Sequence, residues 1–196
     1  MPTIATTAAD RPIITAEGGT YALILFCSRA ELVQIGKLGP LELRRGFYVY
    51  VGSALGPGGL RARVAHHQKV SQRPHWHIDY LRPHMRLDRV WYSHHRVRRE
   101  HQWARLIHAL RGASVPAAGF GCSDCKCTTH LFFFAGQPSF HEFRQGAGGP
   151  RRLVKAPQRG PPALGSAGCP RALEKAADPK AEGPRYGILT LSLAIT

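Results

Sequence analysis

The composition changes abruptly near residue 146, and this change limits how much of the 196-residue chain can fold. Residues 146–196 contain 8 Gly and 7 Pro among 51 positions, about 29%, without a repeating period. That level is typical of low-complexity chain that does not pack a core. We therefore expect an N-terminal extension (1–17), one folded domain of ordinary size (18–145) and a low-complexity, disordered tail (146–196).

Most of the positive charge lies in the expected domain rather than in the tail. The whole chain has a formal net charge of +15, and residues 18–145 hold 18 basic and 7 acidic residues. Fifteen of those 18 basic residues are Arg, which can bind phosphate through two parallel hydrogen bonds. An excess of this kind indicates a polyanionic partner, and nucleic acid is the usual one.

Acidic residues are too few for a typical two-metal nuclease, which needs about three or four converging carboxylates. The domain contains only Glu31, Glu42, Asp79, Asp88, Glu100, Asp124 and Glu142. One divalent metal held by a single carboxylate fits this supply better.

Several features argue against export or a membrane location. No apolar run reaches the roughly 18 residues that span a bilayer. Residues 1–16 lack the basic and then apolar layout of a secretory signal. An odd number of cysteines, five, also speaks against a disulfide framework. We expect a cytoplasmic protein with no membrane partner, and no protein partner can be named.

Hydrophobic patterning predicts an α+β fold with a small, mainly antiparallel sheet flanked by helices. The predicted strands are 20–27, 47–52, 87–92 and 129–134, with a hairpin at 31–43 and helices at 60–70 and 98–110. The segment 76–81 is too short to assign. Helix 98–110 is the clearest, because its apolar residues recur at the helical period and Gly112 follows as a stop signal.

Two predicted strands each carry a tyrosine beside glycine. One reads Gly19-Thr20-Tyr21 and the other Tyr50-Val51-Gly52-Ser53, and a glycine-rich turn then leads into a helix with arginine and histidine. Further blocks are GFYVYVGSA (46–54), GPGGLRARVAHH (56–67), HWHIDYL (75–81) and FGCSDCKCTTHLFFF (120–134). In this order the blocks resemble the GIY-YIG nuclease superfamily over about 18–143, and most closely an uncharacterised branch, a domain of unknown function.

The resemblance implies a metal-dependent endonuclease that hydrolyses phosphodiester bonds in DNA by a single-metal mechanism. Glu100 matches the helix glutamate that holds Mg²⁺ or Mn²⁺, and Arg63 matches the arginine at the scissile phosphate. Tyr21 and Tyr50 match the paired tyrosines, one of which is the candidate base, and the sequence leaves open which one. The chain departs from the superfamily at Thr20, where Ile or Val is usual, and in a longer gap between the two tyrosines.

Other residues near these motifs are candidates with plainer alternatives. His67 follows Arg63 by one helical turn and is expected to contact the phosphate or a tyrosine. The candidate substrate-binding residues are Ser53, Gly59, Arg61 and Trp76. For Arg61 the alternative is a solvated side chain, for Gly59 a plain turn, and for Trp76 core packing, against stacking on a base.

A cysteine cluster, Cys122-x-x-Cys125-x-Cys127-x-x-His130, forms a second candidate site. The ligand types suit zinc, but the spacing differs from paired zinc knuckles. Reduced thiols near a strand start are the preferred interpretation, with zinc as the alternative and a Cys125–His130 nucleophile as a third. The rival functions are a noncatalytic nucleic-acid-binding module on the same fold and a zinc-stabilised interaction protein.

Overall fold

The computed structural model describes residues 14–123, 125–147 and 186–190. The labelled elements are β1 (Gly19–Cys27), β2 (Glu31–Ile35), β3 (Gly39–Leu43), β4 (Gly46–Ala54), α1 (Gly59–Gln68), α2 (His77–Leu81), β5 (Arg86–Ser93), α3 (Glu100–His108), β6 (Leu131–Phe134), α4 (Phe140–Gly146) and β7 (Tyr186–Thr190). Short 3-10 helices occupy Gly36–Leu38 and Arg82–His84.

The strands form one antiparallel sheet in the order β6-β4-β1-β5-β7 and a separate β2–β3 hairpin. Strand β1 lies at the centre and is covered on both faces, which explains why its sequence is almost continuously apolar. The α+β class and the antiparallel sheet expected from the sequence are confirmed.

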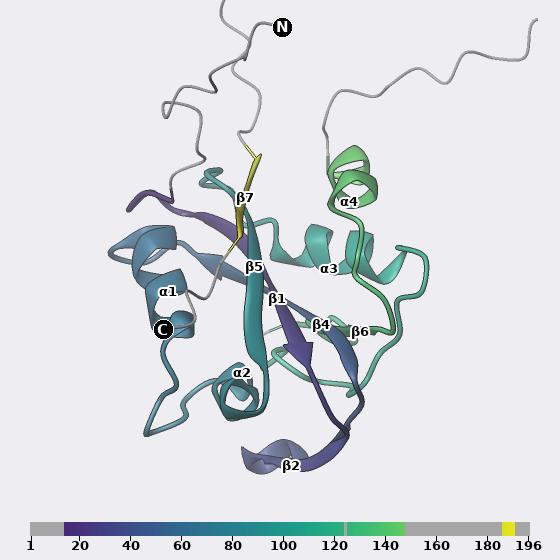
Figure 1. The fold of residues 1–196 in the computed structure, drawn as a ribbon. Coiled ribbons are helices and arrows are strands. Elements are labelled where there is room, and N and C mark those ends of the chain that lie inside the picture. The colour runs from purple at the N-terminus through teal and green to yellow at the C-terminus, as the bar shows by residue number, and fades with distance from the viewer. Residues whose placement is uncertain (1–13, 124, 148–185, 191–196) are drawn as a thin grey trace, which may run out of the picture.

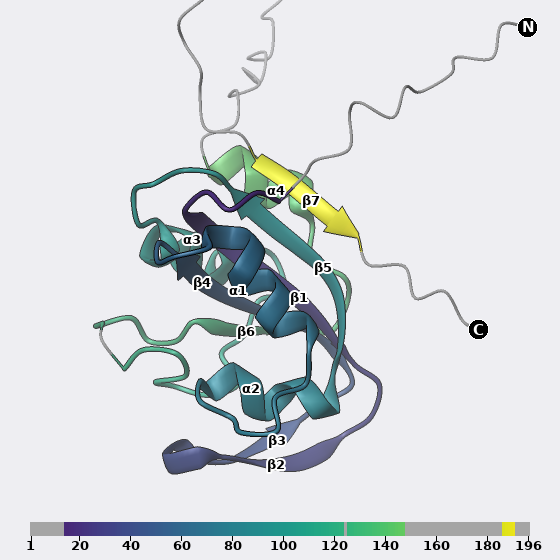
Figure 2. The same ribbon diagram turned by 90° about the vertical axis from the view of Figure 1, so that its left-hand side faces the viewer.

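Helices cover both faces of the sheet (Figure 1). Helices α1 and α2 pack on the face that carries Leu23 and Tyr48, whereas α3 and α4 pack on the face that carries Ile24 and Val49. Figure 2 shows α1 and α2 in front of the sheet, with the β2–β3 hairpin below them. Alternate residues of β1 and β4 therefore supply two separate hydrophobic cores.

Every strand, hairpin and helix expected inside 18–134 is present, with ends that differ by a few residues. The unassigned segment 76–81 forms α2, and α4 was not expected. Within the expected tail, β7 pairs with β5 as an edge strand, so this part of the tail is ordered into the sheet. The prediction of a disordered tail also covers 148–185 and 191–196, which lie outside the described residues.

No helix in the described part of the chain combines the length and the hydropathy needed to cross a bilayer.

Candidate active site and a metal-ligand cluster

A cavity of about 500 Å³ opens beside β4, just past the end of β6. Pairing of β4 with β6 stops at Tyr50 and Leu131, followed by a single bond from the Val51 N–H to the His130 carbonyl. Beyond this point β4 has a neighbour on one side only, the central strand β1. Helices from both faces of the sheet, α1 and α3, therefore contribute side chains to the cavity lining.

The cavity brings together the five residues expected to be catalytic, although they come from four separate elements. Its lining includes Tyr21 of β1, Tyr50 and Ser53 of β4, Arg63 and His67 of α1, Trp76 before α2, and Glu100 of α3. Arg98, His75, His77 and His130 add further nitrogen-bearing side chains. Glu100 is the one carboxylate among the described lining residues.

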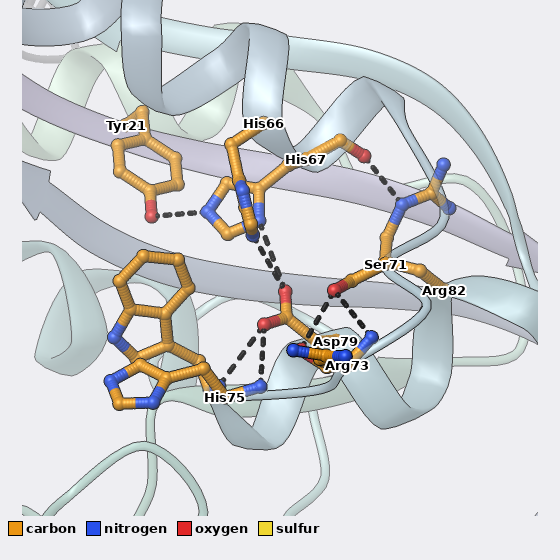
Figure 3. A network of polar contacts seen from close by, with 9 residues as sticks. Tyr21, His66, His67, Ser71, Arg73, His75, Asp79 and Arg82 are labelled. Atoms are coloured by element: carbon orange, nitrogen blue, oxygen red, sulfur yellow. Dashed lines mark hydrogen bonds and ion pairs between the residues drawn. The ribbon is translucent and has the colours of Figure 1, made fainter.

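Tyr21, His67 and Asp79 form a buried polar chain at the base of the cavity (Figure 3). The Tyr21 hydroxyl lies 2.8 Å from Nε2 of His67, and Nδ1 of His67 lies 3.9 Å from a carboxylate oxygen of Asp79. Asp79 also accepts hydrogen bonds from the backbone N–H groups of His75 and Trp76 and pairs with His66 at 3.2 Å.

Burial sets the protonation of this chain. It lowers the pKa of His67 to about 3, although the Asp79 carboxylate acts in the opposite direction. Burial alone would raise the pKa of Asp79, but the N–H groups of Trp76 and His75 hold it below its ordinary value. At neutral pH His67 is therefore an uncharged imidazole, and Tyr21 donates its hydroxyl hydrogen to Nε2 in the tautomer that carries its hydrogen on Nδ1, the nitrogen facing Asp79.

Both tyrosines are neutral phenols in the free protein. Burial raises the pKa of Tyr21 well above its ordinary value, and the neighbouring Tyr50 raises it further. Burial also raises the pKa of Tyr50, while the Arg63 charge opposes this shift. A basic neighbour thus lies close to the tyrosines, but its effect on their pKa values is smaller than that of burial.

Gly52 provides the space in which the Tyr21 ring lies. A Cβ added at Gly52 would be 2.5 Å from the Tyr21 hydroxyl oxygen and 2.6 Å from the adjoining ring carbon. Any larger residue would displace the phenol from His67, so the glycine of the Tyr50–Ser53 motif has a steric role.

Arg63 and Trp76 form one wall of the cavity. The Arg63 guanidinium carbon lies 4.3 Å from the centroid of the Trp76 ring, a cation–π contact. Trp76 also meets the His66 ring edge-on at 4.9 Å. The structure therefore gives Trp76 a packing role and a place in the cavity lining at the same time.

Glu100 is 6% exposed, and its Oε1 lies 3.4 Å from Arg98 and 3.7 Å from Nε2 of His101. The backbone N–H just before it, that of Arg99, donates to the buried Thr20 hydroxyl at 3.2 Å. Thr20 thereby fixes the start of α3 against β1, which gives a physical reason for threonine at this position of the motif.

Two candidate substrate-binding residues do not line the cavity. The Arg61 side chain is exposed on α1 and is absent from the described lining. The Gly59 N–H donates to Gly56, and the next two N–H groups of α1 donate to Glu17 and Thr15. Since these donors already have backbone acceptors, the structure does not support the phosphate contact expected at Gly59.

Among the residues that the structure describes, two groups of side chains could hold a metal ion. One consists of His101, Cys125, Cys127 and His130, and the other of His66, His67 and Asp79. In the second group the side chains already bond to one another and to Tyr21. The first group shares Cys125, Cys127 and His130 with the ligands considered for zinc, but it contains His101 of α3 and not Cys122, whose thiol donates to the Phe120 carbonyl.

Asp79 and His101 were missed as site residues in the sequence. Asp79 lies two positions after the dense block His75-Trp76-His77, and His101 directly follows Glu100. Both residues therefore had a local signal in the sequence. Their partners are distant in the chain, however, and only the fold brings them together.

The fold and cavity define an α+β domain with a basic, histidine-rich pocket that contains one carboxylate. The family model described as "Domain of unknown function DUF123" matches residues 20–147, and the chain belongs to this family. Comparisons with curated proteins and with solved structures gave no match.

Proposed function

We propose that the protein is a metal-dependent endonuclease that hydrolyses phosphodiester bonds in DNA, as the resemblance to GIY-YIG nucleases implies. The observation that carries this proposal is the convergence of two phenols, one guanidinium and one carboxylate in a single cavity. These groups lie up to 79 positions apart in the chain, from Tyr21 to Glu100, and belong to different elements. A purely structural role does not require them to face the same space.

The basic groups of the cavity suit a phosphodiester. Arg63 can donate two parallel hydrogen bonds to the scissile phosphate, and Trp76 stacks on its guanidinium and limits its motion. Arg98 adds a second positive charge at the lining. Both charges would stabilise the extra negative charge that develops on the phosphate in the transition state.

Glu100 fits the single-carboxylate ligand of a hard divalent cation, because its carboxylate lines the cavity. The side chains of Arg98 and His101 lie within ion-pair distance of this carboxylate. A Mg²⁺ or Mn²⁺ ion held there would neutralise charge on the phosphate and assist the leaving oxygen.

Tyr21 is the better placed of the two tyrosines to accept a proton. Its own hydrogen points to His67, which leaves an oxygen lone pair for a water in the cavity. As the water oxygen attacks phosphorus, its proton passes to Tyr21 and the Tyr21 proton passes to Nε2 of His67. The bond from phosphorus to the leaving oxygen breaks, and this oxygen takes a proton from solvent water. Asp79, 3.9 Å from Nδ1, stabilises the charged imidazole.

A nuclease assay on branched, nicked and single-stranded DNA, with and without Mg²⁺ or Mn²⁺, tests the proposal. Glu100→Ala and Arg63→Ala are expected to reduce cleavage by about a hundredfold or more. Arg61→Ala is the matched control, because Arg61 lies on the same helix outside the cavity and should retain most of the activity. Cleavage that persists in Glu100→Ala with unchanged metal dependence would refute the assigned role.

Binding of DNA without cleavage under all metal conditions would instead support the alternative, a noncatalytic nucleic-acid-binding module on the same fold. The basic cavity lining is compatible with this function, since Arg63 and Arg98 would contact phosphate in both cases.

A further inference from the structure

We propose that His101, Cys125, Cys127 and His130 form a structural zinc site that fastens the segment before β6 to the start of α3. This inference does not depend on nuclease activity. It rests on the placement of four side chains from two separate parts of the chain.

The four ligand atoms already lie close enough together to bind one ion. All of them are within 4.8 Å of one another. Nδ1 of His101 lies 3.2 Å from the Cys127 sulfur, and Nε2 of His130 lies 3.5 Å from the Cys125 sulfur. Around a tetrahedral zinc, with bonds of about 2.3 Å to sulfur and 2.0 Å to nitrogen, such pairs are separated by about 3.5 Å.

The chemistry of the ligands favours zinc over other ions. Two thiolates and two imidazoles are a standard set for tetrahedral Zn²⁺, whereas Mg²⁺ and Ca²⁺ prefer oxygen ligands. Two thiolates also balance the charge of the ion. Because the protein supplies all four ligands, no position remains for water or substrate, which indicates a structural site rather than a catalytic one.

The segment that carries three of the ligands is prepared by its own backbone. The Gly119 N–H donates to the Thr128 carbonyl at 2.7 Å, and the His130 N–H donates to the Phe120 carbonyl at 2.8 Å. These bonds close the segment into a loop whose two ends are adjacent. The 12 positions of this loop, 119–130, contain no labelled helix or strand. A metal ion is therefore a suitable anchor for the cysteines of the loop.

His101 connects the proposed zinc site to the cavity. Its Nδ1 faces Cys127, and its other ring nitrogen, Nε2, lies 3.7 Å from Oε1 of Glu100. If Nδ1 binds zinc, the hydrogen must be on Nε2, where it faces the carboxylate. His130 is 3% exposed and contributes to the cavity lining as well. Zinc would thus act as a positioning group for Glu100 and for one wall of the cavity.

The first test measures the zinc content of the purified full-length chain by mass spectrometry, after expression with added zinc and purification under reducing conditions. About one zinc ion per chain is expected for the natural protein. The zinc content of the Cys125→Ser/Cys127→Ser double variant should be lower by about tenfold or more. Cys122→Ser is the matched control, since Cys122 lies in the same loop but outside the cluster, and it should retain its zinc.

A natural protein without zinc, a double variant with full zinc, or an equal loss in Cys122→Ser would overturn the proposal. Where the double variant does not fold, Co²⁺ added to the zinc-stripped natural protein gives the answer. Intense visible bands together with a thiolate charge-transfer band are expected for a tetrahedral site with two sulfurs. A weak octahedral spectrum would contradict it. Neither measurement uses DNA, so failure of the nuclease proposal leaves both results interpretable.

Discussion

His67 is a buried, uncharged imidazole at the cavity lining, and its burial links the stability of the protein to pH. Its folded pKa of about 3 lies below the ordinary value of 6.5, so the unfolded chain binds more protons between these two values. The contribution is fully present above pH 6.5 and is lost as the pH falls. Each pH unit below 6.5 should remove about 1.4 kcal/mol from the free energy of unfolding.

Urea unfolding at pH 7.0 and at pH 4.5 measures this effect. Asp79 acts in the same direction, but its pKa lies below 3.8, so the range above pH 4.5 reports mainly on histidine. His67→Gln should flatten the difference between the two pH values, whatever its effect on stability at neutral pH. An equal slope in the variant would assign the pH dependence to other groups, such as His77.

Gly52→Ala tests whether the space below Tyr21 is required. The added methyl group would overlap the phenol, and relief of this overlap should cost about 1–3 kcal/mol of stability and displace Tyr21 from His67. Gly136→Ala is the control, because a Cβ there would meet no atom within 4 Å. Thermal unfolding compares the two variants, and a harmless Gly52→Ala would contradict the steric argument.

At the scale of elements, the link from β1 to α3 depends on one hydroxyl group. Thr20→Val keeps the shape of the side chain but leaves the Arg99 N–H without its acceptor. The expected cost is about 1–2 kcal/mol of stability. For the proposed cleavage, kcat should fall with an almost unchanged KM, because Glu100 loses its support while the phosphate contact proposed for Arg63 is kept.

Thr20→Ser retains the hydroxyl and should restore kcat. If the Thr20→Val and Thr20→Ser variants have the same kcat in cleavage assays, Thr20 contributes only to packing and the proposed positioning role is wrong.

Local patterns predicted the strands of the first 134 residues and the two longer helices, but not the short helices α2 and α4 or the strand β7. The apolar runs of β1 and β4 and the helical period of α3 identify these elements without tertiary information. Helix α2 has five residues and α4 has seven, too few for the period to be recognised. β7 follows a long Gly- and Pro-rich segment, and its pairing depends on β5 rather than on its own sequence.

The sequence likewise predicted some residues of the candidate active site and missed others. Motif resemblance pointed to Tyr21, Arg63 and Glu100, and the structure places all three in one cavity. It did not point to Asp79 or His101, because each acquires its partner only through tertiary contacts, over 12 positions to His67 and 26 positions to Cys127. The phosphate contact weighed for Gly59 gains no support, because its N–H donates to Gly56 and the next two N–H groups of α1 donate to Glu17 and Thr15, in a segment whose position the sequence does not reveal.

For the molecule as a whole, the net charge of +15 predicts binding to DNA that weakens steeply with salt. Fluorescence anisotropy with a labelled duplex in EDTA measures this binding without cleavage. Arg63→Ala should lower the slope of log K against log salt by about one, as expected for the loss of a single phosphate contact. A slope near zero for the natural protein would contradict a polyanionic partner.

Strand β7 has a consequence for anyone who shortens this protein. It covers the outer edge of β5, where Arg89–Ser93 pair with Tyr186–Thr190. A chain cut after residue 147 would leave these backbone groups open to a second molecule, and such an edge invites self-association. Removal of the C-terminal quarter of the polypeptide is therefore expected to promote self-association, because it removes β7 from the edge of β5.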